Sequence, residues 1–162
     1  MRRSRRRCVV VISALSLAFY AAVPKVAYAE SFNAKTTIIV AKVFGFLAHK
    51  PAPDSKVIIF PGAADLAVAK ANMATLNVVE GTVADATTAF AVVVNTQEEA
   101  RAVRSANPQS LIISGDLPCV DDGDCHVVIQ SKPNVKIFIN LAAIKASGIE
   151  FEANFKMLIT AR

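Results

Sequence analysis

Tryptophan is absent from the 162-residue sequence, and the two tyrosines, Tyr20 and Tyr28, both lie before residue 30. Phenylalanine is therefore the only aromatic residue from residue 30 onward, which excludes tyrosine and tryptophan platforms for sugars or quaternary amines. Glycine is also scarce, and the six glycines are all isolated from one another. Neither a P-loop nor a dinucleotide fingerprint can be built from them, because both motifs need several glycines at fixed spacing.

Acidic residues are missing from the first 29 residues, which hold six of the 18 lysines and arginines. The rest of the chain carries 12 basic and 13 acidic residues, so the formal net charge of +5 comes from the N-terminal stretch. A nucleic-acid-binding domain normally shows a basic patch. The nearly neutral balance of residues 30–162 argues against nucleic acid as a partner.

Residues 1–29 have the three parts of a secretory signal peptide. A basic start between Arg2 and Arg7 precedes an apolar run over residues 9–23, and Ala27-Tyr28-Ala29 matches an A-x-A cleavage site. The apolar run is short for a membrane span, which needs about 20 residues. We expect cleavage after Ala29 and a periplasmic protein of residues 30–162, a length typical of one domain. An uncleaved membrane anchor is the alternative.

Only two cysteines, Cys119 and Cys125, lie beyond the leader, and a turn-rich acidic stretch separates them. In an oxidising compartment such a local pair favours a disulfide, with two free thiols as the alternative. A zinc site that includes His126 is disfavoured because it lacks a fourth ligand. Asp116, Asp121, Asp122 and Asp124 do not follow the EF-hand order, which favours a solvated turn over a calcium site. We expect no metal and no cofactor.

Short apolar segments alternate with helical ones along the first two thirds of the mature chain. Helices are predicted over residues 34–49, 63–72 and 97–105, and strands over residues 56–60, 75–80, 89–95 and 110–114. Continuous apolar strands that alternate with helices indicate a mostly parallel sheet covered on both faces.

The pattern changes after residue 114. Residues 115–124 are predicted to form an acidic loop, and residues 125–130 and 135–139 two strands joined by four residues. A connection of this length predicts an antiparallel hairpin, which we place at the sheet edge. A helix over residues 141–147 follows, and the period of residues 149–159 does not decide between strand and helix.

The helix over residues 34–49, for which Ser31 or Asn33 is a plausible N-cap, is apolar on two sides and must bury both. Phe44 and Phe46 lie about 200° apart around its axis and cannot both point at one sheet. We expect one of them to face the core and the other a partner, with Ile39 and Val43 completing this partner-binding face. The alternative is that both phenylalanines are core residues.

The stretch from Val135 to Ile149, VKIFINLAAIKASGI, resembles a signature of the YfiR-like family. In that family a strand ending F-x-I-N leads into a helix L-x-A-A-x-x-A-G-L. Upstream, Ile112-Ile113-Ser114-Gly115-Asp116 looks like the family's strand and V-S-D turn. The helix over residues 34–49 is similar to the family's first helix in place and apolarity, although the family's tyrosine and terminal W-P are absent here.

The resemblance implies a Rossmann-like three-layer α/β fold with a mostly parallel sheet of five or six strands. It also implies a role: YfiR-like proteins are periplasmic, non-enzymatic repressors in c-di-GMP signalling. They act through protein–protein interaction, by binding the periplasmic sensor domain of a membrane signalling protein. A diguanylate cyclase or a sensor histidine kinase is therefore the expected partner, with a homodimer as the expected assembly. The membrane would be reached only through that partner. The pair Cys119 and Cys125 looks like a disulfide of the family.

Two other classes of function stay open. A small-solute-binding domain of a transport or sensing system is compatible with α/β layers. An exported hydrolase is less favoured, because the sequence has no G-x-S-x-G motif. His49, on the polar stripe of the first helix, and His126, beside a cysteine, are more typical of structural histidines than of a general base. A phosphate site at Gly62 is disfavoured because no lysine or arginine lies within five residues of it.

Overall fold

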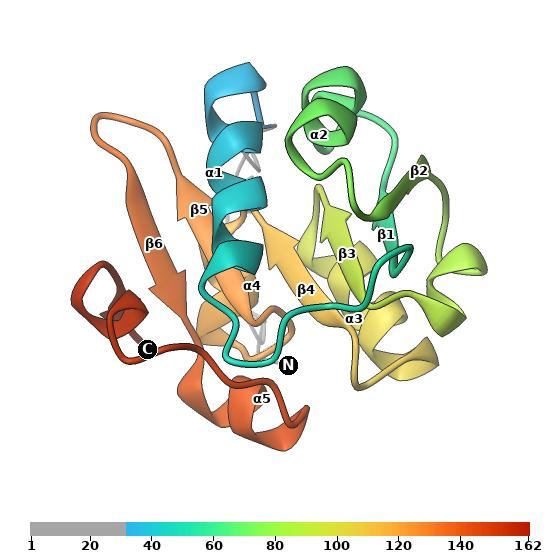
Figure 1. The fold of residues 1–162 in the computed structure, drawn as a ribbon. Helices are drawn as coiled ribbons and strands as arrows, with labels where there is room; N and C mark the ends of the chain where they lie inside the picture. Colours follow the sequence, from blue (N-terminus) through green and yellow to red (C-terminus); the bar gives the residue numbers. More distant parts are fainter. Residues whose placement is uncertain (1–31) are drawn as a thin grey trace, which may run out of the picture.

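A single sheet of seven strands forms the centre of the computed structural model, which describes residues 32–162 (Figure 1). The strand order is β2-β1-β3-β4-β5-β6-β7. The strands are β1 (Lys56–Ile59), β2 (Asn77–Glu80), β3 (Ala91–Val94), β4 (Leu111–Ser114), β5 (Val127–Gln130), β6 (Lys136–Ile139) and β7 (Thr160–Ala161). Neighbouring strands are parallel except β5 and β6. The predicted α/β class with a mostly parallel sheet is confirmed, and so is the antiparallel hairpin.

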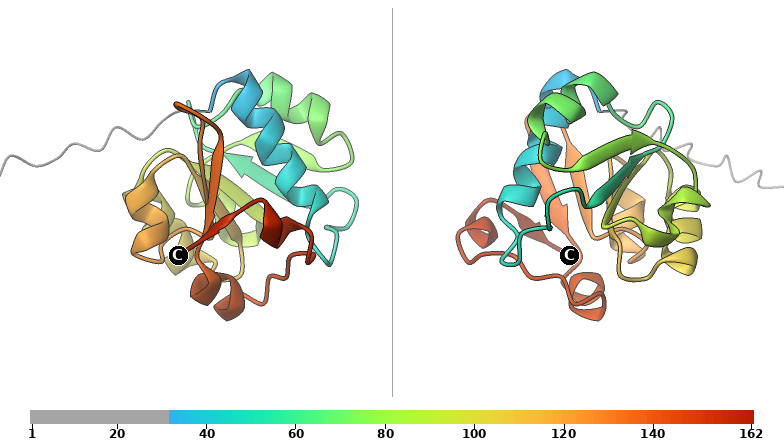
Figure 2. Two further views of the ribbon diagram at one scale, coloured as in Figure 1. Left: turned by 90° about the vertical axis from the view of Figure 1, so that its left-hand side faces the viewer. Right: turned by 45° about the vertical axis from the view of Figure 1, so that its right-hand side comes forward.

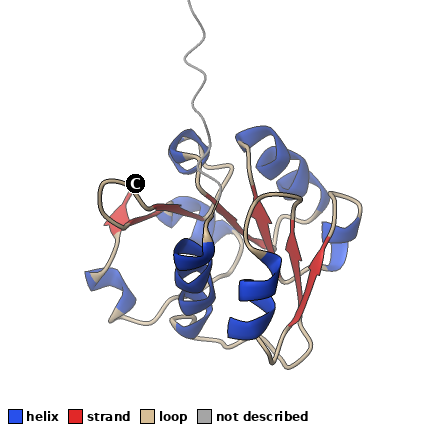
Figure 3. Cartoon of the chain, turned by 90° about the horizontal axis from the view of Figure 1, so that it is seen from above, coloured by secondary structure: helices blue, strands red, loops and turns tan. Residues whose placement is uncertain are grey.

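Helices cover both faces of this sheet, so the domain has three layers (Figures 2 and 3). On one face lie α1 (Ala34–Gly45) and α2 (Leu66–Asn72), and on the other lie α3 (Gln97–Ala106) and α4 (Leu117–Asp121). A fifth helix, α5 (Leu141–Ala146), sits below the sheet at the end of β6 (Figure 1). Two single turns, η1 (Asp85–Thr88) and η2 (Phe155–Met157), complete the elements. This arrangement is consistent with a Rossmann-like sandwich.

The core lies around the central strands. All residues of β3 and β4 are buried, and so are three of the four residues of β1 and of β5. Their side chains point alternately to the two faces, so both faces must be apolar and both must be covered. This explains why the sequence reads here as continuous apolar runs rather than as an alternation.

Polar side chains at the helix starts satisfy the free backbone N–H groups. The Oδ1 atom of Asn33 accepts a hydrogen bond of 3.0 Å from the N–H of Thr36, which identifies Asn33 as the cap of α1. Thr96 and Glu99 form a capping box at α3. Asn140 caps α5, with its Oδ1 atom 2.7 Å from the N atom of Ala143. These caps fix where the helices begin.

Three boundaries differ from the expectation. The first helix ends at Gly45 rather than at residue 49, because the backbone of residues 46–48 pairs with the C-terminal segment (residues 148–162). The predicted acidic loop contains α4, a short helix that begins around Pro118. The hairpin does not lie at the edge and the sheet has seven strands, because β7 pairs with β6 and takes the edge position.

Cys119 in α4 and Cys125 just before β5 form a disulfide, with a Cα–Cα separation of 5.2 Å. This separation is typical of disulfides. Both side chains are fully buried. The bond therefore closes the end of α4 onto the start of β5 inside the core, and it is compatible with an extracytoplasmic location. Within residues 32–162, no helix is long and apolar enough to cross a membrane.

Replacing both cysteines (Cys119→Ala and Cys125→Ala) should lower the free energy of unfolding by about 2 kcal/mol, because the unfolded chain loses a short closed loop. Urea denaturation of the two proteins measures the difference. Intact mass after alkylation is the control: unreduced, denatured protein should take up no label at these two positions. Uptake of two labels would contradict the bond.

Candidate functional site

The residues expected to form a partner-binding face on the first helix are for the most part covered by the protein itself. Val43 and Phe44 are buried in the core, and the ring centroid of Phe44 lies 6.1 Å from that of Phe90. Ile39 and Phe46 are half-buried and pack against the same core. The assignment of Val43 and Phe44 to a partner surface is therefore wrong, because a folded molecule does not present them.

Phe46 does point away from the sheet, but other residues of the same chain cover it. Its ring stacks on Phe155 at a centroid distance of 4.9 Å, and Phe155 stacks on Phe151 at 4.6 Å. Phe155 is fully buried between them. These three rings, the aromatic cluster, hold the C-terminal segment against the end of α1. Phe44 is thus a core residue, whereas Phe46 is half-buried beneath the C-terminal segment.

Backbone and charged groups strengthen the same contact. The N–H of Ala48 donates to the carbonyl of Glu150 and the N–H of Glu152 to that of Phe46, at 2.9 and 2.8 Å. The Nζ atom of Lys50 lies 2.9 Å from a carboxylate oxygen of Glu152, and this contact lowers the pKa of that carboxyl. Both groups are partly exposed, so the pair contributes little to stability.

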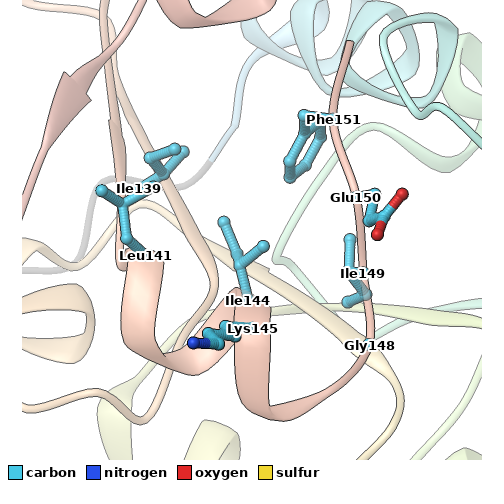
Figure 4. A pocket seen from close by; sticks show the side chains of 8 residues that line it. All are labelled: Ile139, Leu141, Ile144, Lys145, Gly148, Ile149, Glu150 and Phe151. Carbon is cyan, nitrogen blue, oxygen red and sulfur yellow. The ribbon is translucent and has the colours of Figure 1, made fainter. Parts of the chain in front are cut away.

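An apolar groove opens between α5 and the C-terminal segment, with a volume of about 440 Å³ (Figure 4). It is lined by Ile139, Leu141, Ile144, Lys145, Gly148, Ile149, Glu150 and Phe151. The side chains of Ile144 and Phe151 approach each other from opposite walls, whereas Glu150 points away (Figure 4). Leu141 on the rim is 49% exposed. The groove thus combines an apolar floor with one cation and one anion at its margin.

The groove is built largely by the stretch that resembles the YfiR-like signature. Six of its eight lining residues fall between Val135 and Ile149. This stretch stood out in the sequence by its resemblance, but the binding surface was predicted on the first helix instead. The other wall of the groove is the C-terminal segment. Its two phenylalanines, the half-buried Phe151 and the buried Phe155, are spaced by four residues and were the available signal in the sequence.

Ligands of open parallel sheets often bind at the carboxyl ends of the strands, where the strand order reverses. In this sheet that point lies between β1 and β3. There the Nδ2 atom of Asn95 donates to the carbonyl of Pro61 at 3.0 Å, and Glu99 accepts from the N–H of Asn95 at 2.8 Å. The first of these hydrogen bonds joins the loops that follow β1 and β3 at this point.

The acidic residues around the disulfide make separate contacts. Asp124 pairs with Arg101 at 2.7 Å, Asp121 lies 3.5 Å from Arg162, and the side chain of Gln97 donates to both Asp122 and Asp124. Asp116 is nearly buried, and burial raises its pKa. In the described part of the chain no three or more histidine, cysteine, aspartate or glutamate side chains gather as a metal site would require.

The two histidines occupy opposite environments. His49 is exposed, with its Nε2 atom 3.6 Å from a carboxylate oxygen of Glu150. His126 is fully buried beside the disulfide, and its Nδ1 atom accepts a hydrogen bond of 3.0 Å from the N–H of Ile112. Burial, together with the charge of Arg104, lowers the pKa of His126 to about 4. A buried imidazole tied to a strand acts as a structural group.

Comparison with known proteins gives no family for the chain. No known protein-family model matches it, and no curated protein is significantly similar to it. The observations that bear on function are therefore the groove, the aromatic cluster, the disulfide and the YfiR-like resemblance.

The aromatic cluster should be essential for attaching the C-terminal segment. Phe155→Ala removes a fully buried ring and should cost about 3–5 kcal/mol of unfolding free energy. Met157→Ala is the matched control from the same turn, and since Met157 is exposed it should change stability by about 0.5 kcal/mol or less. Urea denaturation followed by circular dichroism measures both. Equal stabilities would contradict the anchoring role.

Stability should fall on acidification because of His126. In the unfolded chain this imidazole takes up a proton near pH 6.5, whereas in the folded protein it does so only near pH 4. Its contribution is therefore complete above pH 6.5 and is lost as the pH falls toward 4, by about 3 kcal/mol in all. His126→Asn keeps an oxygen acceptor for Ile112 and does not titrate. Urea denaturation at pH 7 and pH 4.5 should show a smaller loss for this variant than for the original protein.

Proposed function

We propose that the mature protein is a periplasmic, non-catalytic regulator that binds the periplasmic sensor domain of a membrane diguanylate cyclase or sensor histidine kinase and represses it. One observation carries the proposal: the stretch that resembles the YfiR-like signature builds most of the apolar groove. The resemblance and the geometry thus point to the same part of the chain.

The groove suits a protein partner better than the first helix does. Its floor is apolar, its rim residue Leu141 is half exposed, and Lys145 and Glu150 flank it with opposite charges. An exposed apolar patch bordered by polar groups is typical of an interaction site. In the proposal the sensor domain of the signalling protein occupies this groove, and α1 serves only as its support.

The disulfide supports an extracytoplasmic setting for this interaction. Cys119 and Cys125 form a fully buried bond within the core. We assign it a structural role, because it fixes α4 to β5 and lies away from the groove. We also propose that the protein acts as a homodimer, as the resemblance implies, which sedimentation velocity can test.

Capture experiments test the proposal directly. When the mature protein is immobilised as bait, it should bind the periplasmic domain of a diguanylate cyclase or histidine kinase from its own cell. Leu141→Glu should weaken this binding by about tenfold or more, since it places a charge in an apolar contact. Ile38→Glu, on another exposed apolar position, in α1, is the matched control and should bind normally. Binding that survives Leu141→Glu but is lost with Ile38→Glu would contradict the groove.

A further inference from the structure

Exposed apolar side chains concentrate near the C-terminal end of the chain. Of the five large apolar residues that are exposed in the described part, four lie between residues 135 and 158. The two most exposed are neighbours: Met157 is 82% and Leu158 is 59% exposed, at the end of η2. Single exposed apolar residues need no explanation, but two adjacent ones on one turn form a protruding apolar tip.

The tip is attached to the body of the protein through the first residue of its turn. Phe155, the first residue of η2, is fully buried in the aromatic cluster. The N–H of Leu158 donates to the carbonyl of Phe155 at 2.9 Å. The same turn therefore buries its first side chain completely and presents its last residues to solvent. This geometry displays Met157 and Leu158 on a fixed support.

Basic residues outnumber acidic ones in the part of the chain that carries the tip. From residue 125 onward the chain has five basic and two acidic residues, whereas residues 32–124 have seven basic and ten acidic ones. Lys136 in β6 and Lys145 in α5 are exposed, whereas Arg162, which follows β7, lies 3.5 Å from Asp121 and over the ring of Phe138. These elements and η2 lie on the side of the molecule that carries β7 (Figure 2, left). Of the two acidic residues, Glu152 is neutralised by Lys50 and Glu150 lies beside His49, toward α1.

We propose that this face docks onto the surface of an anionic phospholipid bilayer, with Met157 and Leu158 inserted among the lipids and Lys136 and Lys145 against the headgroups. Apolar insertion combined with positive charge is the pattern of reversible membrane-surface binding. Charge complementarity favours anionic lipids, because the basic side chains would not be attracted electrostatically to a bilayer without net charge. Membrane contact is then direct and not only through a protein partner.

Vesicle sedimentation tests the docking with the exported protein. It should bind vesicles of equal parts phosphatidylglycerol and phosphatidylcholine, bind phosphatidylcholine vesicles weakly, and dissociate as salt is raised. Replacing both tip residues (Met157→Ser and Leu158→Ser) should weaken binding by about tenfold or more. Lys136→Gln and Lys145→Gln should each weaken it by about fivefold.

Ile38→Ser is the matched control, because Ile38 is also exposed but lies on α1. It should bind vesicles as the original protein does, and circular dichroism should show every variant folded. Absence of binding to the anionic vesicles, or binding unaffected by the double serine variant, would overturn the proposal. If the double variant instead loses a captured sensor domain while no form binds vesicles, the tip is a protein contact and the lipid proposal is wrong.

Discussion

The burial of the central strands on both faces is the constraint on which the rest of the structure depends. The strands β1, β3, β4 and β5 are almost entirely inaccessible to water. Such a sheet is stable only when helices cover both sides, and the chain supplies α1 and α2 for one face and α3 and α4 for the other. Most of the apolar side chains of α1 are thereby fully or partly buried against the core. Surfaces for recognition have to come from elements outside these layers.

The C-terminal segment supplies those surfaces. It crosses the end of α1, where the stacked rings of Phe46, Phe155 and Phe151 fasten it. On its way it forms one wall of the apolar groove, and near its end it forms β7 at the sheet edge. One segment with little regular structure thus creates a concave apolar site and a convex apolar tip. The two sites are built on the same aromatic anchor.

Much of the fold could be predicted from the sequence, because the apolar strands before residue 114 and their alternation with helices leave few alternatives. The hairpin and the cysteine pair were likewise readable from local spacing. The end of α1 could not be predicted from the sequence, because the backbone after Gly45 pairs with Phe151, more than a hundred residues later. The site was missed for the same reason: whether Phe46 meets a partner or Phe155 depends on a long-range contact that helical periodicity does not encode. The helix α4 was not predicted, because a five-residue helix in an acidic loop is too short to show a helical period of apolar residues.

The pairing of Leu47 with Phe151 also means that the end of α1 is covered only by residues that are synthesised much later. Synthesis proceeds from the N-terminus, so α1 is available before residues 148–162. Until those residues arrive, Phe46 has no cover and the groove has only one wall. A chain cut short before Phe151 would thus retain most of its core strands yet display an uncovered aromatic ring. The arrival of residues 148–162 thus decides whether this ring is covered or is open to proteases and chaperones.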